Sequence, residues 1–278
     1  MRVAGLSPAA VTDDGRTGHP PRTSNSTTEE EDGHVALSFL GYTARTLSMT
    51  ASLTSCKPRI LCLHGYYQHA SIFANKIAGA RRKIERAYDL HFLDGPILLP
   101  PLQVGDNDND EFGAEEPASL LSLPPRGWWC KSETGDYLLI HEAFEYIAKH
   151  VKEECVQYDA IIGFSQGGTL ATALAVSGIL GPNLRAVVTA GAPYNQQVFQ
   201  IALELQTTSP NDVVNGFDNV PKLHFAGSTD ALVSMESTSE LCRSGGSGKL
   251  IVHDQGHLFP TRSARVKEVL DFLDVAFS

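Results

Sequence analysis

The most constraining stretch of this sequence runs from Ala160 to Gly168 and reads AIIGFSQGG. An apolar run meets Gly-x-Ser-x-Gly and then small residues, a pattern that predicts a buried strand, a sharp turn and a helix. Gly163 and Gly167 fit there because a Cβ at either position would clash with the flanking strand or helix. The helix start also offers free backbone N–H groups, which favour negative charge. Ser165, at the tip of the turn, is therefore the predicted nucleophile.

From Pro58 onward, short apolar runs alternate with segments of helical period. This alternation predicts a single α/β domain, built as one doubly wound, mostly parallel sheet. Residues 97–133 are expected to be irregular, and an excursion over 194–219 has room for a small lid helix. The predicted strands span 59–64, 88–93, 160–164, 184–190, 222–226 and 249–253, and the predicted helices span 70–87, 136–156, 169–177, 234–242 and 263–276.

The first 55 residues differ in composition from the rest of the chain. They are rich in Gly, Pro, Ser, Thr and Asp and include the acidic run Glu29–Asp32. Such a composition buries too little apolar surface to offset the entropy of ordering a chain. We therefore expect a disordered leader over 1–55 and the folded domain over 56–278. A transit peptide is the rival interpretation, but transit peptides are poor in acidic residues.

Two other stretches look like ligand loops but fail in detail. Residues 105–111 resemble the start of a calcium loop, yet Glu111 stands where that loop needs glycine and Pro117 where it needs glutamate. The glycine-rich Gly245–Lys249 lacks the hydroxyl residue of a phosphate loop and precedes a strand rather than a helix. We expect a solvated acidic loop and a flexible turn, and neither a metal nor a cofactor.

Composition and charge narrow the class of partner. The chain has 278 residues and a net charge of −10, which argues against nucleic acid or an anionic membrane as a main partner. No apolar run approaches the roughly 20 residues that cross a bilayer. The five cysteines are odd in number and form no C-x-x-C pair, so we expect reduced thiols in a cytoplasmic or nuclear protein.

A serine hydroxyl is a weak nucleophile at neutral pH, and it needs a base that is itself oriented by a carboxylate. In enzymes with this kind of turn, the acid and then the histidine follow the serine along the chain, on loops after later strands. Asp230 and His257 meet this order, because each follows a predicted strand beyond Ser165. Parallel strands end at one edge of a sheet, so these three residues are the predicted catalytic triad.

Other candidates fit these roles less well. His253 lies at the end of its predicted strand and His224 in the middle of another, so both have less freedom to reach a nucleophile. Asp212 and Asp218 lie in the excursion before the strand that leads to Asp230. Cys62 lies inside an apolar strand, where packing is its expected role.

The tetrahedral intermediate of acyl transfer carries a negative oxygen that two backbone N–H groups should face. One is the N–H of Gln166, directly after the nucleophile, and the other is expected from Tyr66, in the loop after the first strand. His64 precedes Ser165, so we expect it to fix this loop rather than to act as the base. Trp128 and Trp129 are the two tryptophans, and they could line a pocket or cover the core.

Six short motifs of the sequence belong together: His64–Gln68, Asp94–Pro96, Trp128–Trp129, Ile162–Gly167, Gly227–Asp230, and Gly256–His257 with Pro260. Taken together, they resemble the FSH family of serine hydrolases, a group of esterases and thioesterases. The resemblance covers the chain from about Pro58 to its end and leaves the leader outside. It implies an α/β-hydrolase fold with a minimal lid and a Ser165–Asp230–His257 triad.

The sequence thus predicts a serine hydrolase that cleaves an ester or thioester of a small acyl substrate through an acyl-enzyme. Two alternatives stay open at this point. One is an acyl-protein thioesterase or lysophospholipase-like carboxylesterase. Such enzymes share the order of the triad and the turn over Gly163–Gly167 that carries the nucleophile, which we call the elbow. The other is a hydrolase-fold module that only binds a small ligand. Acyl chain length, ester or thioester preference and oligomeric state do not follow from the sequence.

Overall fold

The computed structural model describes residues 57–100, 123–208, 220–246 and 248–278. Three sets of predictions lie outside these ranges and stay predictions. They concern the leader over 1–55, the acidic stretch 105–111, and the candidates Asp212 and Asp218.

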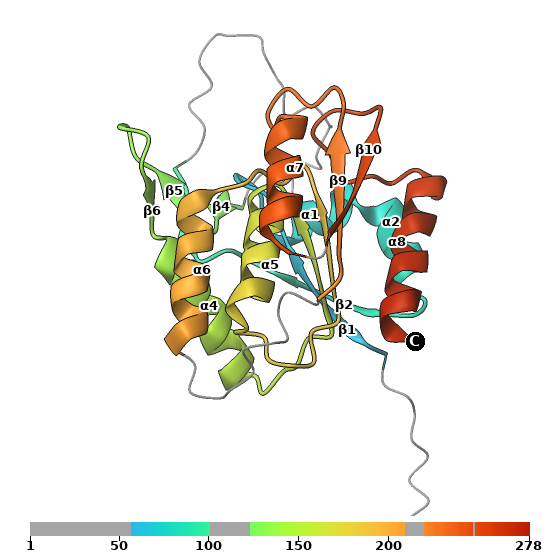
Figure 1. The fold of residues 1–278 in the computed structure, drawn as a ribbon, viewed down its shortest axis with the longest axis horizontal. Coiled ribbons are helices and arrows are strands. Elements are labelled where there is room, and N and C mark those ends of the chain that lie inside the picture. Colours follow the sequence, from blue (N-terminus) through green and yellow to red (C-terminus); the bar gives the residue numbers. More distant parts are fainter. Residues whose placement is uncertain (1–56, 101–122, 209–219, 247) are drawn as a thin grey trace, which may run out of the picture. The chain divides into compact units, whose positions relative to one another are not determined.

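Six described strands form one parallel sheet, in the order β10-β9-β8-β7-β1-β2 (Figure 1). β2 follows β1 in the chain, but β7 pairs with the other side of β1. This reversal makes the carboxyl ends of β1 and β7 a switch point of the sheet, where ligands of doubly wound folds bind. The strands are Arg59–Leu63 (β1), Asp89–Leu93 (β2), Ala160–Phe164 (β7), Ala186–Ala190 (β8), Lys222–Gly227 (β9) and Gly248–His253 (β10).

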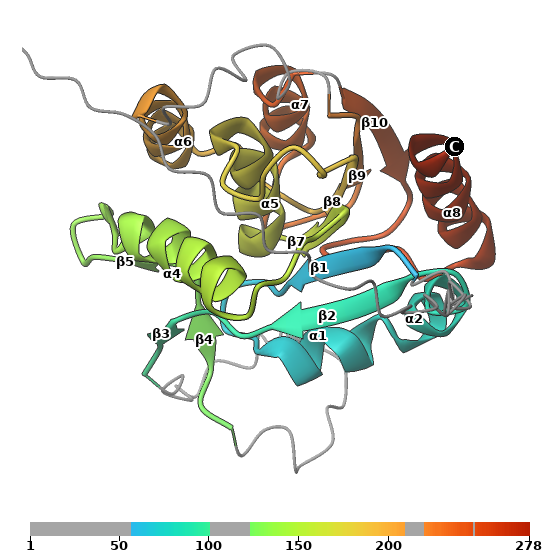
Figure 2. The ribbon, with the colours of Figure 1, turned by 90° about the horizontal axis from the view of Figure 1, so that it is seen from below.

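Helices cover both faces of the sheet, as Figures 1 and 2 show. One buried cluster joins β-strand side chains to α4, α5, α6 and α7, and a second joins them to α1, α2 and α8. Alternate residues of β1 enter the two clusters, with Leu61 in the first and Ile60 in the second. The doubly wound α/β fold predicted from the sequence is thereby confirmed. The helices are Ala70–Lys76 (α1), Ala78–Ile84 (α2), Ile140–Glu153 (α4), Gln166–Ser177 (α5), Gln196–Thr208 (α6), Met235–Ser244 (α7) and Ser263–Phe277 (α8).

Two short antiparallel pairs occupy part of the segment between β2 and α4. β3 (Ile97–Leu98) pairs with β4 (Arg126–Gly127), and β5 (Cys130–Lys131) pairs with β6 (Tyr137–Leu138). The predicted helix start at residue 136 is therefore wrong. Tyr137 and Leu138 are paired in β6, and Leu139 has a φ of 65°, so the helix begins only at Ile140.

Two further helices differ in detail from the sequence expectation. The predicted helix over 70–87 is two helices, because Ile77 leaves helical geometry with φ −97° and ψ 15° between them. The excursion after β8 contains α6, whose Val198 and Ala202 are fully buried in the cluster shared with α5. α6 is thus anchored in the core along that face.

Strand β7 and helix α5 pack so closely that no side chain fits at Gly163 or Gly167. All five residues of β7 and all twelve of α5 are buried. A Cβ on Gly167 would lie 2.3 Å from the backbone oxygen of Leu63, and one on Gly163 would lie 2.4 Å from the oxygen of Gly167. Glycine is therefore required at both positions, because the start of α5 lies directly against β7 and β1.

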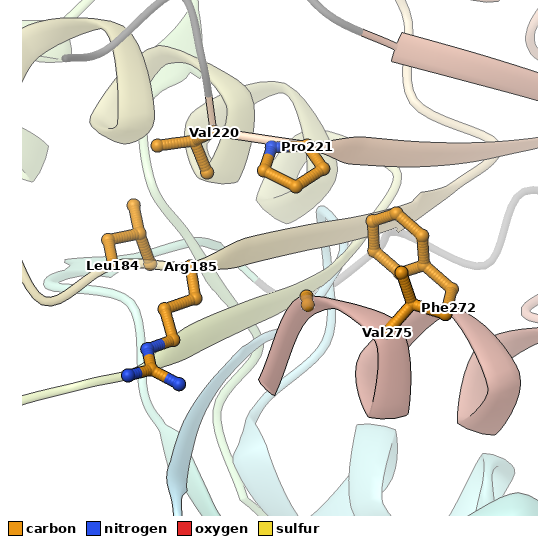
Figure 3. Close-up of a pocket in the computed structure, with 7 residues that line it drawn as sticks. Leu184, Arg185, Val220, Pro221, Phe272 and Val275 are labelled. Carbon is orange, nitrogen blue, oxygen red and sulfur yellow. The ribbon is translucent and has the colours of Figure 1, made fainter. Parts of the chain in front are cut away.

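A cavity of about 420 Å³ lies at the edge of the sheet where the strands begin, opposite the edge that carries Ser165 (Figure 3). Leu184 and Arg185 precede β8, and Val220 and Pro221 precede β9, so this cavity lies at the amino ends of the strands. Phe272 of α8 covers it from the side. It is therefore separate from the carboxyl edge that carries Ser165.

Substitution of Gly167 by alanine tests this close packing. We expect Gly167→Ala to lower the free energy of unfolding by about 1–3 kcal/mol or more, because the added methyl group overpacks a site bounded by backbone atoms. Gly79→Ala, within helix α2, is the matched control, because the added Cβ would meet only the side chain of Thr261, at 4.0 Å. That control should gain up to about 1 kcal/mol. Urea unfolding measures both, and equal stability of the two variants would contradict the packing argument.

Candidate active site

Ser165 lies between β7 and α5 in a strained backbone conformation. Its φ is 51° and its ψ is −120°, outside the regions that a residue with a side chain normally adopts. Its N–H donates to Ala190 O at 2.9 Å, and its carbonyl accepts from the N–H groups of Gly168 and Thr169 at 2.9 and 3.1 Å. These bonds fix the strained turn in place. The side chain consequently lines a cavity instead of entering the core.

Asp230 and His257 come together although 27 residues separate them. His257 Nδ1 lies 2.8 Å from Asp230 Oδ2, and the Asp230 side chain is only 1% exposed. The other carboxylate oxygen, Oδ1, accepts from the N–H groups of Leu232 and Val233 at 2.9 and 2.8 Å. The carboxylate is thus held from both sides. An Nδ1–H donated to it leaves the Nε2 lone pair of His257 available as a base.

The Asp230–His257 pair lies beside the elbow. The His257 ring centroid is 4.9 Å from that of Phe164, the residue before the serine. A Cβ on Gly191, which follows β8, would lie 3.0 Å from His257 Nδ1 and 3.5 Å from Asp230 Oδ2. The imidazole therefore packs over the ends of β7 and β8. The described atoms form no Ser165–His257 hydrogen bond, and in unliganded enzymes such bonds are often long.

The turn that carries His257 depends on another glycine and another histidine. A Cβ on Gly227 would lie 2.2 Å from the backbone oxygen of Gln255, so only glycine lets this turn close over the end of β9. His253 Nδ1 accepts from the Gln255 N–H at 3.3 Å, which braces the same turn. His253 is buried, and burial lowers the pKa of its imidazole. His253 thus has a bracing contact with the turn, and His257 alone of the two bonds Asp230.

Tyr66 and Gln166, the predicted oxyanion donors, lie on the same cavity as Ser165. Within the described ranges, neither backbone N–H is used by another backbone group. The loop of Tyr66 approaches the elbow closely, since a Cβ on Gly65 would lie 3.3 Å from Ser165 Cβ. The two N–H groups are thus available to a ligand.

His64 is the buried organiser of the Tyr66 loop. Its Nε2 accepts from the Gly95 N–H at 2.8 Å, so its proton lies on Nδ1, 2.8 Å from Gly65 O. Burial lowers the pKa of this imidazole to about 4. His64 therefore stays neutral at physiological pH, where both ring nitrogens are already engaged by the backbone.

The Gln166 side chain ties the elbow to the tryptophan segment, a contact that the sequence analysis did not identify. Its Oε1 accepts from Trp128 N at 2.8 Å, and its Nε2 donates to Trp129 O at 2.9 Å. Trp128 Nε1 in turn donates to His64 O at 2.9 Å. Trp128 is fully buried and Trp129 lines the cavity, so the two tryptophans divide the two roles expected for them.

The cavity at Ser165 has a volume of about 200 Å³. Its walls come from the loop after β1, the β5–β6 hairpin, the elbow and the segment before α6. The hairpin was missed because each of its strands is two residues long, although Thr134-Gly135-Asp136 is a turn signal. The lining residues are Tyr66, Trp129, Cys130, Lys131, Tyr137, Ser165, Gln166, Thr169, Pro193, Tyr194 and Asn195.

Three further features of the described residues concern metal ligands, cysteines and helix length. In those ranges, no three His, Cys, Asp or Glu side chains are grouped to hold a metal ion. The four described cysteines are free thiols, and burial raises the pKa of Cys62 far above its usual range. Among the described helices, none has the length and apolar character that a membrane span requires.

Comparison with known proteins gives the family and the fold. The family model described as serine hydrolase (FSH1) matches residues 52–269. An uncharacterized hydrolase of Schizosaccharomyces pombe is 30% identical over 238 residues, which are 80% of this chain and 52% of that protein. The chain thus spans about half the length of this relative. Esterase OVCA2 of Danio rerio is 26% identical over 77% of this chain and 96% of that protein.

Solved structures confirm the fold alone. Arabidopsis thaliana SOBER1 superposes with a TM-score of 0.54 at 15% identity, covering 80% of this chain and all of that one. Zea mays acyl-protein thioesterase 2 gives a TM-score of 0.53 at 15% identity, covering 80% of this chain and 95% of that one. At such low identity the likeness carries no information about the substrate.

Acid should destabilise the protein through its buried neutral histidines. Burial lowers the pKa values of His64 and His224 to about 4, below the usual value of 6.5. Between these pH values the unfolded chain binds protons that the folded protein does not. As the pH is lowered from 6.5 towards 4, the free energy of unfolding therefore falls by up to about 1.4 kcal/mol per pH unit for each histidine. Urea unfolding from pH 7 to pH 4 measures this slope. His224→Asn should reduce the slope, whereas the exposed control His141→Asn should not.

The Gln166 contact can be followed by fluorescence, because both tryptophans of the chain lie on it. Gln166→Leu leaves the Trp128 N–H and the Trp129 carbonyl unpaired, at a cost of about 1–3 kcal/mol for each buried group. We expect red-shifted emission and greater quenching by iodide than in the wild type. Gln200→Leu, at an exposed position of α6, is the control. Wild-type emission in Gln166→Leu would show that the tryptophans are held by other contacts.

Proposed function

Because this chain belongs to the FSH1 family of serine hydrolases, we propose that it is a serine esterase or thioesterase that works through an acyl-enzyme on Ser165. The observation that carries the proposal is the Asp230–His257 pair, with its 2.8 Å contact, packed against the elbow residue Phe164. The cavity beside Ser165, of about 200 Å³, suits a small acyl group. Its ester or thioester is the proposed substrate.

The first half-reaction forms the acyl-enzyme. Ser165 Oγ attacks the carbonyl carbon while its proton passes to Nε2 of His257, and Asp230 stabilises the imidazolium through Nδ1. The negative oxygen of the tetrahedral intermediate accepts hydrogen bonds from the N–H groups of Tyr66 and Gln166. Loss of one such donor typically costs about 2.7–4 kcal/mol of barrier. The imidazolium then returns its proton to the departing alcohol or thiol.

The second half-reaction releases the acid. A water molecule gives a proton to His257 Nε2 and attacks the acyl carbonyl from the side that the alcohol or thiol has left. The same two N–H groups receive the negative oxygen again. When the intermediate collapses, His257 returns the proton to Ser165 Oγ, so the enzyme is regenerated and the acid departs.

A fluorophosphonate probe tests whether Ser165 is activated. We expect the folded wild type to be labelled and Ser165→Ala to be unlabelled, as judged by gel fluorescence and intact mass. Hydrolysis of p-nitrophenyl butyrate should fall at least about a thousandfold in Ser165→Ala and in His257→Ala. His253→Asn, which keeps an acceptor near the Gln255 N–H, should lose far less.

Two results would contradict this function. An unlabelled, correctly folded wild type would favour a hydrolase-fold binding module instead. Equal loss of hydrolysis in His257→Ala and His253→Asn, with both variants folded, would mean that the choice of base is wrong or that both histidines take part. An acyl-protein thioesterase activity would appear as preference for acylated peptides over simple esters of the same acyl chain.

A further inference from the structure

The cavity at Ser165 contains one charged side chain among its lining residues, that of Lys131. The other lining residues are aromatic, hydroxyl-bearing, amide or apolar. Lys131 lies in β5, in the hairpin that forms one wall of the cavity.

The hairpin holds Lys131 against the cavity. Lys131 is directly opposite Tyr137 in the β5–β6 register, and side chains at opposed positions share one face of a hairpin. Its Nζ lies 5.8 Å from the centroid of the Tyr137 ring, a cation–π contact. Both residues line the cavity, as does Cys130, so the hairpin forms one of its walls.

No described carboxylate neutralises this ammonium group. None of the ion pairs within 4.0 Å among the described residues involves Lys131. In the turn of the same hairpin, Asp136 Oδ2 instead accepts from the Thr134 hydroxyl at 2.7 Å. The acid of the proposed triad, Asp230, is 1% exposed and paired with His257. The ammonium group of Lys131 thus belongs to a wall of the cavity and has no described counter-ion.

We propose that Lys131 is a specificity-determining residue that selects acyl esters or thioesters carrying an anionic group away from the scissile carbonyl. The proposal rests on the esterase or thioesterase activity proposed above. A carboxylate or phosphate of the substrate replaces water around the ammonium group while the carbonyl lies at Ser165. The anion can belong to the acyl chain or to the leaving group, and the two are separated by experiment.

Matched substrate pairs isolate the contribution of the charge. The acyl pair is p-nitrophenyl hydrogen glutarate and its neutral methyl ester, and the leaving-group pair is butyryl-coenzyme A and butyryl-pantetheine. For each pair the readout is the ratio of kcat/KM for the anionic substrate to that for the neutral one. In one of the two pairs, Lys131→Met should lower this ratio about two- to fivefold, the range for an exposed ion pair.

Three features distinguish the contact from a general effect of the substitution. The change should lie in KM, because the ion pair is made equally in the ground and transition states. It should shrink at high salt, and Lys131→Arg should retain the wild-type ratio. Lys249→Met, at an exposed position of β10 outside the cavity, is the control and should leave the ratio unchanged.

An unchanged ratio in both pairs for Lys131→Met would overturn this inference. If the neutral esters are still hydrolysed in that case, the proposed esterase or thioesterase function stands. If the wild type hydrolyses none of the four substrates and is not labelled by the fluorophosphonate, both proposals fail. The two failures are therefore distinguishable.

Discussion

The contact on which this structure depends is the approach of helix α5 to strands β1 and β7, so close that no side chain fits between them. Gly167 lies against the carbonyl of Leu63, and Gly163 lies against the carbonyl of Gly167. A wider separation would relax the turn that holds Ser165 at a φ of 51°. The same approach brings the N–H of Gln166 to the loop after β1. Backbone contacts therefore position the serine and the N–H of Gln166, and the His64 side chain organises the loop that carries Tyr66.

Polar side chains then connect this centre to the wall of the cavity, and they do so in uncharged form. Gln166 bonds both tryptophan residues through its amide, and His64 bonds the backbone through both ring nitrogens. Neutral groups with all partners satisfied avoid the large cost of burying a charge. The Asp230 carboxylate, paired with His257, lies beside the elbow and has backbone N–H groups on its second oxygen. The site thus keeps charge where proton transfer is proposed and excludes it from the supporting contacts.

The parts of this molecule that could be predicted are those with a local or an ordered signal in the sequence. The Gly-x-Ser-x-Gly turn has a five-residue pattern, and Asp230 and His257 follow strands in the order that the topology requires. The sequence therefore predicted that the two side chains would approach each other, and they lie 2.8 Å apart, while their catalytic roles stay a prediction. The β5–β6 hairpin was not predicted, because two-residue strands have no measurable period and Tyr137 to Leu139 fit a helix as well. The bond of the Gln166 amide to the tryptophan segment joins positions 37 and 38 residues apart and leaves no pattern in a single sequence. Lys131 could be assigned to the cavity only after that hairpin was known.

The central position of β1 has a consequence for how the chain reaches this state during synthesis. β1 can pair with β2 soon after both are synthesised. Its other neighbour, β7, follows about 100 residues after β1 in the chain, and the Arg59 N–H bonds Asp159 across that separation. Until then the apolar β1 presents an unpaired edge, which is the kind of surface that joins chains together. Contacts so distant in sequence also form slowly. A ribosome-bound chain that ends before β7 would accordingly be a client for chaperones, and release of the finished chain from them should coincide with the arrival of the elbow.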